Sequence, residues 1–154
     1  MKVAILAAVV LGACALAGPS AAHAQSAPCA SGVHKAVLPT WARAGFSDKR
    51  PVFTYALGAS DRIAAVVFGY PLLSPPGKTR GNKILWVSHS AVRPMSDLKI
   101  HAQRMVGARP VGPVVLRTVD GGPGPSIVDL PAAGCWRLAL SWSGKSDTLD
   151  LRYR

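Results

Sequence analysis

Proline and glycine interrupt residues 25–154 about every eight to twelve residues, and this spacing restricts the fold more than any other feature of the sequence. The runs between these breaks are short and rich in Val, Ile, Leu, Trp and Tyr. Such a pattern is typical of an antiparallel β-sandwich or barrel. No segment keeps the apolar period of an amphipathic helix. We therefore predict an all-β domain, a sandwich of about seven to eight strands.

The last residues, GCWRLALSWSGKSDTLDLRYR (134–154), contain the clearest hairpin. Apolar side chains alternate with small or polar ones, so one face of each strand should be buried. The turn is expected at Ser143–Ser146, where Gly144 can adopt a positive φ. The predicted core positions of this hairpin are Trp136, Leu138, Leu140, Trp142, Leu149, Leu151 and Tyr153.

Two earlier runs, Ile63–Phe68 and Ile84–Val87, are apolar without alternation. Continuous apolar runs are typical of central strands that are covered on both faces. In the run beginning at Leu98, alternation places Leu98, Ile100 and Ala102 inside and Lys99, His101 and Gln103 outside. The other expected strands are Val52–Leu57, Leu98–Arg104, Val114–Val119 and Ser126–Leu130.

The N-terminal 24 residues have the layout of a secretory signal peptide: Lys2, an apolar run and small residues that end in Ala22-His23-Ala24. We predict cleavage after Ala24. The apolar run is too short for a transmembrane helix, which needs about 20 apolar residues. A second possibility is open, because Leu11-Gly12-Ala13-Cys14 resembles a lipoprotein signal in which Cys14 becomes lipidated.

Removal of residues 1–24 leaves 17 Lys and Arg residues against seven Asp, a net charge of +10, and no Glu. Cys29 and Cys135 also remain. In a chain that has left the reducing cytosol, two cysteines are expected to form a disulfide. Residues 25–50 have weak strand character and should wrap the sandwich of residues 51–154, with Trp41 and Phe46 packed onto it.

The segments FGYPL (68–72), NKILWVS (82–88) and GPSIVDLPAAGCWRLALSWSG (124–144) resemble a group of small exported bacterial proteins of uncharacterised role. The GCWRL segment is similar to the last hairpin of immunoglobulin-like extracytoplasmic domains. The resemblance covers about residues 38–154 and implies an immunoglobulin-like antiparallel β-sandwich. It implies no activity and no functional residues.

Common catalytic arrangements are missing from the sequence, and we predict a protein that is not an enzyme and holds no cofactor. A glycosidase needs two carboxylates, whereas the Asp residues are scattered near turns, where they can cap backbone N–H groups. The segment GPSIV (124–128) lacks the second glycine of a nucleophile elbow. PPGKTRG (75–81) lacks the first glycine of a phosphate-binding loop. The turn-associated carboxylates are Asp61, Asp97, Asp120 and Asp147.

A metal site is an alternative function. His and Met side chains fall close together in the sequence, and imidazole and thioether ligands suit copper in an oxidising compartment. Against this, the spacing follows no compact ligand pattern, and His34 is isolated. The candidate ligands of a copper carrier are His89, Met95, His101 and Met105.

The positive charge is the feature with the clearest physical consequence, because it attracts anions at a distance and loses effect as salt screens it. We therefore predict an exported binding or structural module, a monomer, that contacts anionic components of the cell envelope. Nucleic acid is not expected as a partner, because the aromatic residues that would stack on bases are assigned to the core. The predicted contact residues are Lys78, Arg80, Lys83, Arg93, Lys99 and Arg104.

Overall fold

The computed structural model describes Cys29 and residues 32–154. The predicted cleavage site after Ala24 and the alternative lipidation site Cys14 lie outside these residues. Among the described residues, no helix is long and apolar enough to cross a membrane.

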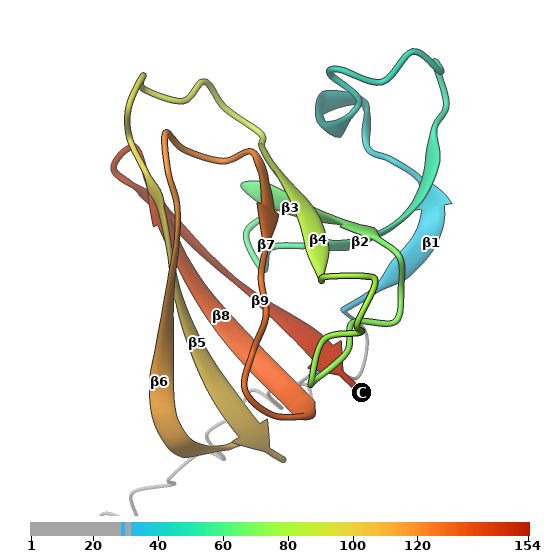
Figure 1. Ribbon diagram of the computed structural model, residues 1–154. Helices are drawn as coiled ribbons and strands as arrows, with labels where there is room; N and C mark the ends of the chain where they lie inside the picture. Colours follow the sequence, from blue (N-terminus) through green and yellow to red (C-terminus); the bar gives the residue numbers. More distant parts are fainter. Residues whose placement is uncertain (1–28, 30–31) are drawn as a thin grey trace, which may run out of the picture.

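Two antiparallel sheets stack face to face and confirm the predicted all-β sandwich (Figure 1). The first sheet has the strand order β1-β2-β3-β4-β7, and the second has the order β6-β5-β8-β9. Two pairings between strands that are not consecutive, β4 with β7 and β5 with β8, produce Greek-key connections like those of immunoglobulin sandwiches. The strands are β1 (His34–Val37), β2 (Val52–Leu57), β3 (Ile63–Phe68), β4 (Lys83–Ser88), β5 (Leu98–Val106), β6 (Arg109–Val119), β7 (Pro125–Ile127), β8 (Gly134–Trp142) and β9 (Lys145–Tyr153).

The described part of the predicted wrapping segment, residues 32–50, does more than wrap the domain. His34–Val37 form the edge strand β1, which pairs with β2. A single turn of 3₁₀ helix, η1 (Thr40–Ala42), follows. As predicted, Trp41 and Phe46 pack onto the sandwich, and they do so on the outer face of the first sheet. The N-terminal segment therefore supplies both an edge strand and a cover.

This cover explains why β3 and β4 are apolar without alternation. Ala65 and Trp86 point into the core between the sheets. Ala64 and Val66 point the other way, into a second cluster beneath Trp41 and Phe46. Both faces of the central strands are therefore buried, as the continuous apolar runs predicted.

The tryptophans of the closing hairpin face the core, as predicted, and Trp136 and Trp142 are almost fully buried. The indole N–H of Trp142 donates to Oγ of Ser88 at 3.0 Å, which links β8 to β4 in the opposite sheet. The indole N–H of Trp136 donates to the carbonyl oxygen of Ala132 at 2.9 Å. Each buried indole thus keeps a hydrogen-bond partner.

The hairpin turn is tighter than expected, and it consists of Ser143 and Gly144 alone. Both residues have positive φ, 48° and 73° respectively. Two successive positive φ values are typical of a type I′ turn, whose twist matches that of antiparallel strands. Lys145 consequently belongs to β9 rather than to the turn.

β6 begins at Arg109, five residues before the predicted start at Val114. The longer strand is possible because a bulge between Val111 and Val115 interrupts its pairing with β5. The register of β5 against β6 shifts between Ala102 and Arg104. The side-chain amide of Gln103 donates to the carbonyl oxygens of Val111 at 2.9 Å and Gly112 at 3.1 Å. A glutamine side chain thus satisfies backbone groups that the interrupted ladder leaves unpaired.

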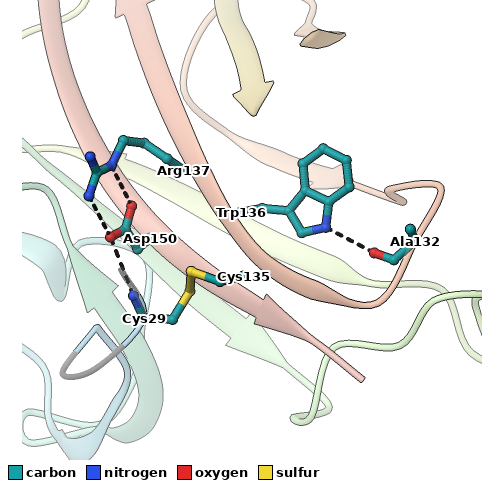
Figure 2. The surroundings of a disulfide bond; sticks show 6 residues. All are labelled: Cys29, Ala132, Cys135, Trp136, Arg137 and Asp150. Atoms are coloured by element: carbon teal, nitrogen blue, oxygen red, sulfur yellow. Dashed lines mark hydrogen bonds and ion pairs between the residues drawn. A yellow bond between two sulfur atoms is a disulfide. The ribbon is translucent and has the colours of Figure 1, made fainter. Parts of the chain in front are cut away.

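The predicted disulfide joins Cys29 to Cys135, with Cα atoms 5.8 Å apart. Figure 2 shows Cys135 and Trp136 pointing to opposite faces of β8, the sulfur toward the outer face and the indole toward the core. Beside the bridge, Arg137 forms a bidentate ion pair with Asp150, at 3.0 and 3.1 Å. This carboxylate also accepts the backbone N–H of Cys29 at 3.4 Å. The ion pair raises the pKa of Arg137.

Tyr153 should make the fold sensitive to alkali. Its hydroxyl is buried and donates to the carbonyl oxygen of Val128 at 2.7 Å. Burial, with a smaller contribution from Asp129, raises the pKa of Tyr153 above its ordinary value. An unfolded tyrosine loses its proton near pH 10, whereas the folded one keeps it to higher pH, so the free energy of unfolding should fall above about pH 10.

The expected loss is up to about 1.4 kcal/mol per pH unit above that point. Urea unfolding at about pH 8 and pH 11 would measure it, with Tyr153→Phe as the variant that cannot ionise. An equal dependence on pH in the variant would show that another group is responsible.

Candidate anion-binding surface

Nearly all the basic side chains lack an acidic partner. Among Cys29 and residues 32–154, Arg137 with Asp150 is the one salt bridge. Several arginines donate instead to backbone carbonyl oxygens. These hydrogen bonds hold loops in place but do not neutralise the charge of the arginines. Arg43, for example, donates to the carbonyl oxygen of Leu38 at 2.7 Å, and Arg117 donates to that of Asp129 at 2.8 Å. The surface therefore keeps most of its positive charge.

Two of the four predicted turn-associated carboxylates, Asp97 and Asp147, are occupied by contacts to backbone N–H groups. Asp147 is buried and accepts the backbone N–H groups of Ser60, Arg62 and Thr148 at 3.0, 3.0 and 2.8 Å. Asp97 accepts the N–H of Gly121 at 3.0 Å. In both cases the capped turn is distant in sequence from the carboxylate.

The six predicted contact residues do not share one face. Lys83 lies over the ring of Phe68 on the outer face of the first sheet, with Nζ 5.5 Å from the ring centroid. Lys99 pairs with Ser141 on the outer face of the second sheet. A single surface through all six residues is therefore wrong.

The basic loop at 71–81 is partly structural. Arg80 donates through Nη1 to the carbonyl oxygen of Gly69 and through Nη2 to that of Pro71, the latter at 2.9 Å. Lys78 is exposed. The loop thus offers one free cation, while Arg80 closes it against the end of β3.

Arg104 does not point outward. It pairs with Trp136, so its side chain begins on the core face of β5. Its Nε atom is buried and has no hydrogen-bond partner among the described residues. A methyl group at Gly134 would lie 3.0 Å from this atom, so the glycine makes room for the guanidinium. Arg104 packs against the end of the sandwich and is not part of an outer basic face.

Arg93 and Lys99, in contrast, each lie near the β8–β9 turn. A depression of about 400 Å³, the hairpin-end depression, lies between this turn and the start of β5. Figure 1 places this turn and the loop from β4 to β5 at the same end of the sandwich, and loop 71–81 at the other end. The polar residues lining the depression are Ser96, Asp97, Lys99, Ser141, Ser143 and Lys145.

Gly144 brings Arg93 to this depression. A methyl group at Gly144 would lie 2.8 Å from Nη2 of Arg93, so the guanidinium lies directly against the glycine. Lys145 Nζ donates to the carbonyl oxygen of Ala91 at 2.8 Å. Lys99 lies on the outer face of the second sheet beside Ser141, whereas Lys145 pairs with the core residue Trp142 and so begins on the core face. Arg93, Lys99 and Lys145 therefore approach one turn from different sides, which makes this end of the molecule the best candidate anion site. The sequence prediction missed Lys145 because it placed this residue in a longer turn.

The predicted copper ligands are not brought together. His89 stacks on Trp41, with ring centroids 4.5 Å apart, at the cover of the first sheet. His101 is exposed on the outer face of the second sheet. Met95 is 87% exposed in a loop, whereas Met105 is 7% exposed beside Cys135. The part of the chain that the structure describes contains no group of three or more His, Cys or Asp side chains able to hold a metal.

Comparison with protein-family models, with curated proteins and with solved structures gave no match. The resemblance to small exported proteins therefore stays a prediction, and the functional argument depends on the described side chains.

Proposed function

We propose that the protein is an exported binding module, without catalytic activity, that contacts anionic components of the cell envelope through the hairpin-end depression. Export is inferred from the signal-like N-terminus, and the Cys29–Cys135 disulfide is compatible with an oxidising compartment. The observation that carries the proposal is the cluster of Arg93, Lys99 and Lys145 around the β8–β9 turn.

The unpaired cations elsewhere on the surface support this proposal in a general way. They raise the local concentration of anions and speed encounter, and salt screens the effect. The cluster adds a defined point of contact. The metal-carrier alternative is not proposed, because its four candidate ligands lie apart.

Neutralising the cluster should reduce binding to anionic membranes. We expect the variant Arg93→Gln/Lys99→Gln/Lys145→Gln to bind vesicles containing phosphatidylglycerol on the order of 100-fold more weakly, since each cation near an anionic surface contributes about 1 kcal/mol. Sedimentation with vesicles at low and high salt measures this. Vesicles of phosphatidylcholine alone give the background.

A charge-matched control is available on the other sheet. Lys35→Gln/Lys49→Gln/Arg50→Gln removes the same charge from exposed positions around β1. A second control, Lys78→Gln/Lys83→Gln, removes two charges from loop 71–81 and the start of β4. A loss in proportion to the charge removed, in all three variants, would show that the effect comes from net charge alone. Binding that is unchanged from low to high salt would overturn the proposed function.

A further inference from the structure

Two serine hydroxyls in the hairpin-end depression are held in a fixed orientation. The backbone N–H of Arg93 donates to Oγ of Ser143 at 2.9 Å. The backbone N–H of Ser143 donates in turn to Oγ of Ser96 at 2.8 Å. A hydroxyl whose oxygen already accepts a hydrogen bond still has its own proton to donate. Ser96 and Ser143 line the depression, so each has a hydroxyl proton available to donate to a ligand there.

The cations in the depression also have donors to spare. Lys145 uses one ammonium proton on the carbonyl oxygen of Ala91 and keeps two. Lys99 lines the same depression, and Arg93 lies against Gly144, which is part of the lining. Asp97 is the carboxylate in the lining, and its Oδ1 accepts the N–H of Gly121 at 3.0 Å. Three cations against one carboxylate give this cluster a net charge of +2.

We infer that the hairpin-end depression binds a phosphoryl group. A phosphate monoester carries a charge of about −1.5 to −2 and three strong acceptor oxygens, which match a net charge of +2 and donors on several sides. A carboxylate carries half this charge and two oxygens. The inference rests on the proposed function and specifies its ligand: a terminal phosphoryl group, carried as a monoester by a lipid headgroup or an envelope polymer, or present as free phosphate.

The serine donors can be removed without changing the charge, which separates this inference from the proposed function. The variant is Ser96→Ala/Ser143→Gly, where glycine suits the positive φ at position 143. The matched control is Ser90→Ala, an exposed serine of the same loop that does not line the depression. Near-ultraviolet circular dichroism verifies that the tryptophan core of each variant is intact.

The affinity for inorganic phosphate and for acetate is measured by NMR titration of the disulfide-bonded protein at constant ionic strength. We expect phosphate to bind at least about 10-fold more tightly than acetate, and the double serine variant to lose about 10-fold toward phosphate. Retention on polyglutamate, which has carboxylates only, should be unchanged in the variant. Equal affinity for phosphate and acetate, or no loss in the variant, would overturn the inference.

The experiments test the proposed function and the phosphoryl site separately, so either one can fail without the other. Salt-sensitive vesicle binding with no preference for phosphate would leave the proposed function standing and remove the phosphoryl site. If the preference is found, excess phosphate is added, at constant ionic strength, to protein on vesicles containing phosphatidic acid, whose headgroup is a phosphate monoester. This competition identifies the source. Release supports the lipid headgroup as ligand at the depression, and no release supports free or polymeric phosphate.

Discussion

Replacement of Cys29 and Cys135 with alanine is expected to lower the free energy of unfolding by about 4–5 kcal/mol. The bridge closes a loop with a sequence separation of 106 residues, so it removes much of the conformational freedom of the unfolded chain. It also holds Cys29 beside Arg137 and Asp150 on the outer face of β8 and β9 (Figure 2). Denaturant unfolding of the wild type and the double variant measures the difference.

Reduction of the wild-type protein serves as a control, because it breaks the same covalent link without a change of sequence. Reduced wild type and Cys29→Ala/Cys135→Ala should unfold at a similar, lowered denaturant concentration. A midpoint equal to that of the oxidised protein would contradict the assigned pairing or its role in stability.

Substitution of Asp147 by alanine is expected to cost about 3–5 kcal/mol. Its carboxylate accepts three backbone N–H groups, two of them in the turn between β2 and β3. The N–H of Ala59 in the same turn donates to the carbonyl oxygen of Thr148 at 2.7 Å. Asp147 thus joins the first sheet to β9 in the second, and its loss leaves donors without a charged partner.

Asp120→Ala is the matched control, since it removes a carboxylate from an exposed turn. This variant should change stability by less than about 0.5 kcal/mol. The denaturant midpoints of the two variants test whether the hydrogen bonds of Asp147 cause its larger loss. Equal midpoints would show that the loss at position 147 is an effect of net charge.

The sequence was informative where one physical rule determined the outcome. Alternation in residues 134–142 predicted the buried face of β8, including Trp136 and Trp142. Continuous apolar runs predicted that β3 and β4 are covered on both sides. Two cysteines in a chain with a signal-like start predicted the disulfide. The alternation, the apolar runs and the cysteine pair can each be read from the sequence itself, and the contacts in the folded protein agree with each of them.

Elements that depend on tertiary contacts were missed. β1 is four residues of mixed polarity that become a strand only by pairing with β2. The start of β6 contains Pro110 and Pro113, which argue against a strand, but an edge strand with a bulge accommodates them. The exact turn at Ser143 and Gly144 depends on two positive φ values that residue types alone did not indicate.

The candidate site was only half predicted. Charge selected Arg93 and Lys99, which both lie near the β8–β9 turn, but it also selected Arg104, whose side chain begins on the core face. Alternation from Leu98 and Ile100 would have placed Arg104 inside. Lys145 and the fixed hydroxyls of Ser96 and Ser143 come together only when the loop from β4 to β5 meets the β8–β9 turn.

NMR shift mapping with anionic ligand gives the most direct test of contact at the β8–β9 turn. The isotope-labelled, disulfide-bonded protein is titrated with bicelles containing phosphatidylglycerol, with neutral bicelles as reference. The largest shifts are expected in residues 93–99 and 141–145, and they should fade at high salt. Shifts confined to residues 71–83, or no difference between anionic and neutral bicelles, would contradict an anion site at this end of the sandwich.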